Sequence, residues 1–102
     1  MSVALLIKHR DRDTVLVPIA TEATYRSVWQ AGATALELDW VEAMQSGIKI
    51  RQDDLPEILF ELRMLRAWFE ASSYSSQSER LDRVVDALKA VSFGAGETAS
   101  IG

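Results

Sequence analysis

The chain contains no cysteine among its 102 residues, and it contains only one histidine. The absence of cysteine excludes disulfide bonds, thiolate chemistry and any zinc site that uses cysteine. Long hydrophobic runs are missing as well, because the apolar run near the N-terminus, Val3–Ile7, is too short for a signal-peptide core or a membrane span. We therefore expect a cytoplasmic protein that does not associate with membranes.

An excess of positive charge is also missing. Acidic residues number 15 against 11 lysines and arginines, and the formal net charge is −4. Such a chain is not drawn to nucleic acid or anionic lipid, and a protein partner of basic character suits it better. Asp11 interrupts the one short basic stretch, Lys8–Arg12, and Asp13 follows it, so we expect no nucleic-acid partner.

Motifs that carry catalysis or ligand binding are lacking. His9 would need an orienting acid, together with a nucleophile or a bound substrate, to act as a general base. Neither Asp11 and Asp13 nor the pair at 53–54 has the spacing of a twelve-residue calcium loop. We expect no catalytic residues, no metal site and no cofactor, and a binding protein rather than an enzyme.

The first and last parts of the chain have simple patterns. Residues 2–9 and 14–19 are rich in Val, Leu and Ile around a charged turn, which predicts a β-hairpin. Thr21 suits the N-cap of an amphipathic helix. Its apolar stripe consists of Tyr25, Val28, Trp29, Gly32 and Leu36.

Residues 78–91 predict a second amphipathic helix. Small residues and glycines after it predict a disordered tail over 92–102, which leaves 1–91 as a single globular domain.

Residues 38–50 allow two interpretations. Alternation around Trp40 and the pattern of Ile48–Ile50 favour a second hairpin that turns at residues 45–47. The alternative is a helix in which Asp39 is the N-cap, Glu42 completes a capping box, and Gly47 ends the segment. We favour the hairpin, because Ile48–Ile50 needs a neighbouring strand.

Residues 54–71 predict a helix that is apolar on two opposite sides. At about 100° per residue, six apolar side chains fall within one arc of about 120°. This first arc consists of Leu55, Ile58, Leu59, Leu62, Leu65 and Phe69. A second arc, centred about 140° from the first, consists of Phe60, Met64, Ala67, Trp68 and Ala71. A helix of this kind has to be covered on both sides.

The large side chains of the second arc, Phe60, Met64 and Trp68, are the candidate partner-binding residues. Burial of each contributes about 1.5–3 kcal/mol, and the three contributions together are of the same order as the whole stability of a domain, about 5–15 kcal/mol. The sequence allows two ways to bury the second arc. The helix over 78–91 can lie across part of the arc, or a second chain, identical or different, can cover it.

The order of the segments predicts an α+β fold. We expect a small antiparallel or mixed sheet of about four strands, packed on one side by helices, in the order ββαββαα. The leading functional hypothesis is a non-catalytic protein–protein interaction module, such as a small acidic immunity protein, an antitoxin or an adaptor. The alternatives are a homo-oligomeric subunit, for example a homodimer formed through Trp68, and a small enzyme or ligand-binding domain whose pocket would use His9, Tyr25 and Asp39.

Overall fold

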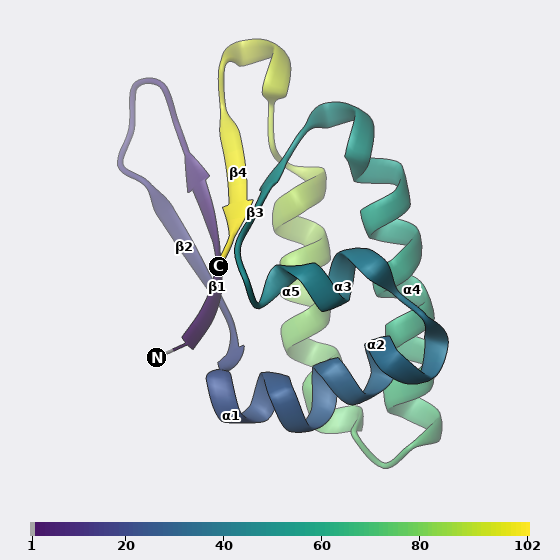
Figure 1. Ribbon diagram of the computed structural model, residues 1–102. Coiled ribbons are helices and arrows are strands. Elements are labelled where there is room, and N and C mark those ends of the chain that lie inside the picture. The colour runs from purple at the N-terminus through teal and green to yellow at the C-terminus, as the bar shows by residue number, and fades with distance from the viewer. Residues whose placement is uncertain (1) are drawn as a thin grey trace.

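An antiparallel sheet of four strands carries helices on one of its faces (Figure 1). The structure is a computed structural model that describes residues 2–102. The strands are β1 (Ser2–Lys8), β2 (Val15–Thr21), β3 (Ile48–Ile50) and β4 (Thr98–Ile101). They lie in the order β2-β1-β4-β3, and every neighbouring pair is antiparallel. The predicted α+β class is confirmed.

Alternation along the strands divides the sheet into a covered and an open face. Leu5, Ile7 and Ile101 are buried on the side of the helices. Their neighbours Lys8 and Ser100 point to the other side, which no helix covers (Figure 1). The sheet therefore has a half-solvated arrangement that antiparallel strands tolerate.

The helical segment after β2 begins where the sequence predicts it. Thr21 caps it, because the Thr21 hydroxyl accepts a hydrogen bond of 3.1 Å from the Thr24 backbone N–H. The segment runs through α1 (Glu22–Thr24), a π-helical turn η1 (Tyr25–Trp29) and α2 (Gln30–Leu36). Tyr25 and Trp29 are fully buried, so the predicted stripe faces the core.

The preferred hairpin over residues 38–50 is wrong in its first half. Residues there form a helix, α3 (Asp39–Met44), and Gly47 has the positive φ of 94° that the alternative interpretation implies. Ile48–Ile50 is a strand, as predicted, but its partner is β4 at the other end of the sequence. Strand β3 therefore finds its hydrogen-bonding partner in β4 and needs no hairpin with residues 38–44, where helix α3 forms instead.

The predicted disordered tail over 92–102 also differs from the structure. After a single 3-10 turn, η4 (Phe93–Ala95), the chain forms β4 between β1 and β3. Ala99 and Ile101 enter the core, with exposed fractions of 3% and 1%. Alternation over four residues is too short a signal to recognise in isolation, but the central position in the sheet buries both side chains.

The two long helices, α4 (Leu55–Ala71) and α5 (Ser78–Lys89), complete the layer over the sheet (Figure 1). Single 3-10 turns, η2 (Gln52–Asp54) and η3 (Ser75–Gln77), precede them. Pro56 lies in the first turn of α4, where its missing N–H costs little. Within residues 2–102, no helix combines the length and the apolar character that crossing a bilayer requires.

Candidate interaction groove

The two apolar arcs of α4 have different environments in the fold. Four residues of the first arc are fully buried: Ile58, Leu62, Leu65 and Phe69. In the second arc, Phe60 is 57% exposed and Met64 is 41% exposed. Half of the double-sided pattern therefore builds the core, and part of the other half faces solvent.

Trp68 is separated from Phe60 and Met64 by its neighbours. It is partly buried against the core, and its ring stacks on Tyr74 with centroids 5.5 Å apart. Helix α2 passes close to it, since a Cβ placed on Gly32 would come within 2.8 Å of the Trp68 ring and within 2.5 Å of Leu65. Glycine at position 32 permits this close approach. Trp68 is therefore held within the chain, and only two of the three candidate binding residues share an open surface.

Helix α5 does not cover the second arc, although its single apolar stripe allows that interpretation. It packs along the opposite seam of α4, where the Arg66 guanidinium donates two hydrogen bonds, of 2.8 and 3.2 Å, to the Asp82 carboxylate. This pairing lowers the pKa of Asp82 and raises the pKa of Arg66. The apolar stripe of α5 is used on the sheet and on the first arc, so Phe60 and Met64 stay uncovered.

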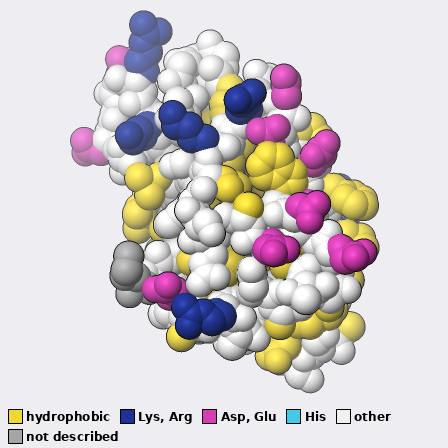
Figure 2. Space-filling model, in the orientation of Figure 1, with side chains coloured by type: hydrophobic (Ala, Val, Ile, Leu, Met, Phe, Trp, Pro, Cys, Tyr) yellow, Lys and Arg dark blue, Asp and Glu magenta, His cyan; other side chains and the backbone are white. Residues whose placement is uncertain are grey.

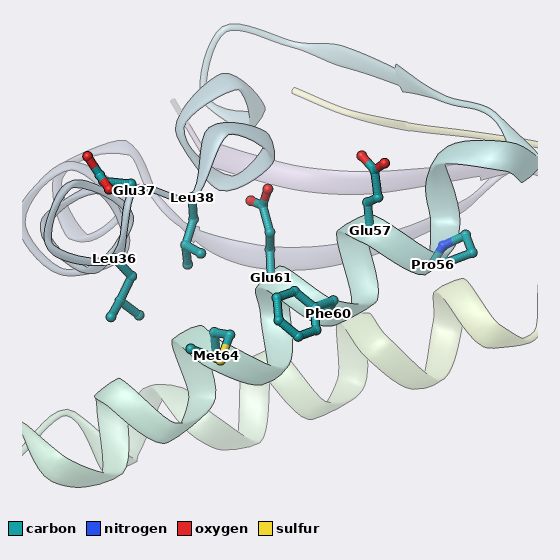
Figure 3. A pocket seen from close by; sticks show the side chains of 8 residues that line it. All are labelled: Leu36, Glu37, Leu38, Pro56, Glu57, Phe60, Glu61 and Met64. Atoms are coloured by element: carbon teal, nitrogen blue, oxygen red, sulfur yellow. The ribbon is translucent and has the colours of Figure 1, made fainter.

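Phe60 and Met64 form one wall of a groove with a volume of about 500 Å³ (Figure 3). Pro56 lies at one end of this wall. The other side is formed by Leu36, the last residue of α2, and by Leu38 in the turn after it. Eight residues line the groove: Leu36, Glu37, Leu38, Pro56, Glu57, Phe60, Glu61 and Met64. We call it the α2–α4 groove.

Glu61 ties the groove to helix α3. Its Oε1 atom accepts backbone hydrogen bonds from Trp40 (2.9 Å) and Val41 (3.1 Å), at the start of α3. Burial raises the pKa of the Glu61 carboxyl, and the two backbone N–H groups partly oppose this shift. The negative charges of Asp39 and Glu57 raise that pKa further. Glu61 therefore has a structural role as well as a place on the rim.

Two more carboxylates complete the rim. Glu57 lies one turn before Glu61 on α4 and accepts a hydrogen bond of 3.2 Å from the Trp40 indole N–H. Glu37 ends α2 in the left-handed conformation, with φ 56° and ψ 51°, where glycine is the usual residue. A side chain at this position costs conformational energy, and such positions cluster at functional sites. In this chain the strained residue lies at the edge of the groove, and its carboxylate is directed away from Phe60 and Met64 (Figure 3).

The negative charge of the chain is concentrated in the stretch of sequence that contributes most of the groove residues. Residues 37–61 contain seven of the 15 acidic residues and two of the 11 lysines and arginines, so the rest of the chain is close to neutral. Figure 2 shows carboxylates gathered among hydrophobic side chains over the helices, while most visible lysines and arginines lie toward the sheet. The groove is therefore apolar along its floor and negative along its rim.

The polar residues of the alternative ligand-binding hypothesis lie in three separate environments. The His9 imidazole pairs with the Glu97 carboxylate at the far end of the sheet. Tyr25 is fully buried, and its hydroxyl donates to the Val41 carbonyl. Burial raises the pKa of Tyr25 well above its usual range. Asp39 is exposed at the start of α3. The structure does not bring these three side chains together.

Several groove residues were not predicted from the sequence. Leu36 and Leu38 join Phe60 only through the packing of α2 on α4, which no local pattern shows. The acidic rim has a signal in the sequence, namely the uneven distribution of charge between residues 37–61 and the rest. A formal net charge for the whole chain conceals that signal.

A scan against protein-family models and searches of curated proteins and of solved structures find no match to this chain. The shape and charge of the α2–α4 groove are therefore what indicate a function.

Proposed function

We propose that the protein is a small protein-binding module whose α2–α4 groove takes a cationic, amphipathic segment of a partner protein. The observation that carries the proposal is the exposure of Phe60 and Met64 inside a groove with an acidic rim. Methionine and aromatic side chains are enriched where proteins bind one another. Exposed groups of this kind on a folded helix are commonly interaction sites.

Charge complementarity indicates the chemistry of the partner. Glu37, Glu57 and Glu61 lie around the apolar floor, and no lysine or arginine from the described part of the chain lines the groove. A partner that buried only apolar groups here would reduce the hydration of the Glu57 and Glu61 carboxylates, which is unfavourable. Lysine or arginine side chains flanking an apolar stripe would satisfy them and would speed association.

The geometry of α4 favours a helical segment. Glu57, Phe60, Glu61 and Met64 are spaced at i, i+3, i+4 and i+7, so they form one continuous strip along the helix. A partner helix laid along such a strip presents apolar and charged side chains at the same spacing. The first probe is therefore a designed helical peptide of leucine and arginine, about 18 residues or about 27 Å long.

The test is calorimetric titration of this peptide into the wild type and into Phe60→Ser. We expect saturable binding to the wild type and a loss of at least about tenfold in affinity for Phe60→Ser, the size typical of a central contact residue. Leu16→Ser is the matched control, because Leu16 is 59% exposed on the open face of the sheet. A second pair compares Glu57→Gln with Glu79→Gln, an exposed glutamate on α5 that pairs with Arg83.

Three results would contradict the proposal. The first is equal binding of a peptide in which glutamate replaces arginine, and the second is equal loss of affinity in Leu16→Ser. The third is a dimer in light scattering that Phe60→Ser converts to a folded monomer, since the groove would then bind a second copy of this chain. An inhibitory role of the immunity or antitoxin kind and a cytoplasmic location remain predictions within this proposal.

A further inference from the structure

A second cavity lies on the open face of the sheet, away from the helices and from the α2–α4 groove. Its volume is about 390 Å³. Strands β1, β4 and β3 contribute to it, together with the residue that follows β3. The lining residues that carry polar side chains are Lys8, Lys49, Arg51, Thr98 and Ser100. Among residues 2–102, no carboxylate lines this cavity.

The strand register explains why these side chains meet. Lys8 is paired with Thr98, and Lys49 is paired with Ser100. Ile50 is paired with Ala99, so continuation of the same register brings Arg51 beside Thr98. Directly opposed residues in antiparallel strands have Cβ atoms about 5 Å apart, so the long side chains of Lys8 and Arg51 can reach one group above Thr98.

The three cations have no counter-ion in the described part of the chain. Within residues 2–102, none of the ion pairs involves Lys8, Lys49 or Arg51. The Asp54 carboxylate contacts Arg51 through the backbone, where it accepts a hydrogen bond of 3.3 Å from the Arg51 N–H. An anion bound among these exposed cations would therefore be attracted by all three and would meet no carboxylate from the lining of the cavity.

We propose that this cavity binds the phosphate group of a small molecule. Phosphate carries about two negative charges near neutral pH and presents acceptor oxygens in several directions. The donors here match that need: an arginine that can bind two oxygens at once, two ammonium groups, and the hydroxyls of Thr98 and Ser100. A phosphomonoester and a diphosphate share this chemistry.

The extent of the positive surface favours a small ligand over a nucleic acid. Nucleic-acid affinity comes largely from many phosphate contacts along an extended basic surface. In this chain three of the 11 lysines and arginines line the cavity, and the net charge of the whole chain is −4. Long-range repulsion would therefore oppose a polyanion, whereas a small phosphate compound meets only the local positive field.

The test is an NMR titration of the full chain with inorganic phosphate and, separately, with pyrophosphate at constant ionic strength set by potassium chloride. We expect saturable shifts of the Thr98 and Ser100 amides, with the better of the two anions indicating a monoester or a diphosphate. The double variant Lys8→Gln/Arg51→Gln should lose at least about tenfold in affinity, and Thr98→Val about threefold, because charged hydrogen-bonding groups contribute more than neutral ones. Arg80→Gln/Lys89→Gln on α5 removes the same charge elsewhere and should leave the affinity unchanged.

Any of three results would overturn the proposal. The first is amide shifts that chloride reproduces at the same ionic strength, and the second is an equal loss of affinity in both double variants. The third is binding only to an oligonucleotide or to phosphatidylserine vesicles, with no saturable response to phosphate or pyrophosphate. Phe60→Ser should leave phosphate binding intact, so failure of the groove proposal and failure of this one are distinguishable.

Discussion

The two apolar arcs of helix α4 use the same kinds of residue for different purposes. Phe69 on the first arc is fully buried and packs edge-on against Trp29 with ring centroids 5.2 Å apart, whereas Phe60 on the second arc is 57% exposed. Leu65 and Met64 are adjacent in sequence and differ in the same way. Amphipathicity on two sides of a helix therefore shows how much apolar surface has to be covered, but not what covers it.

The second arc is itself divided between fold and surface. Helix α2 and Tyr74 cover Trp68, because Gly32 lets α2 approach closely, while the part toward the N-terminus of α4 stays open. Burial of α4 therefore differs between its two ends as well as between its two sides.

The sharpest comparison is between the two phenylalanines. Phe69→Ala should lower the free energy of unfolding by about 3–5 kcal/mol, because it leaves a cavity in a closed core. Phe60→Ala should change it by less than about 1 kcal/mol, as expected for an exposed side chain. Urea unfolding of both variants measures the difference. Similar losses would show that the second arc is part of the core.

The close contact between helices α2 and α4 can be tested by substitution of Gly32. Alanine favours a helix over glycine by about 1 kcal/mol. Gly32→Ala should nevertheless destabilise the protein by about 1–3 kcal/mol, because its methyl group overlaps Leu65 and the rigid ring of Trp68. Gly94→Ala, at a site with nothing within 4 Å, is the control in the same unfolding experiment. A stabilised Gly32→Ala variant would mean that the two helices are not in close contact.

A smaller effect is expected at Glu37, where fold and function should conflict. Glu37→Gly should raise the free energy of unfolding by up to about 1 kcal/mol, because it relieves the left-handed conformation. The same change should weaken binding of the cationic peptide about twofold to fivefold, the size of one exposed charge interaction. Ser73→Gly, with φ 66°, should relieve the same strain without affecting the peptide. Equal peptide affinity in both variants would remove Glu37 from the binding site.

The smallest effects concern pH, and the contributions of Glu61 and Glu97 to stability should change with pH in opposite directions. The pKa of Glu61 is raised in the folded chain, so its contribution to stability should decline as pH rises through the carboxyl range. The pKa of Glu97 is lowered by hydrogen bonds from the Ser92 backbone and from His9, so its contribution should be lost as pH falls. The free energy of unfolding is measured between about pH 3 and 7 for the wild type, Glu61→Gln and Glu97→Gln. The difference between the wild type and each variant gives the slope against pH that the missing carboxyl contributes. Slopes of the same sign would contradict these assignments.

Local patterns predict the parts of this fold that are locally determined. The first hairpin, the Thr21 cap and the two long amphipathic helices follow from alternation, capping chemistry and the helical repeat. The α+β class follows from their order.

Non-local pairing determines the remainder. Strand β4 is short and lies about 90 residues from its partner β1 in the sequence, so no neighbouring pattern predicts a strand there. The same long-range pairing accounts for β3 and leaves residues 39–44 to form a helix. The α2–α4 groove is equally non-local, since its two walls meet only in the packed structure.

An NMR shift map with the leucine–arginine peptide tests most directly whether α4 uses one side for the fold and the other for a partner. We predict that the largest amide shifts lie within residues 36–40 and 56–64, which contain the groove, and that Ile58, Leu62 and Phe69 stay protected from hydrogen exchange. Shifts spread evenly over the acidic residues of the whole chain, or concentrated on the open face of the sheet, would contradict the account.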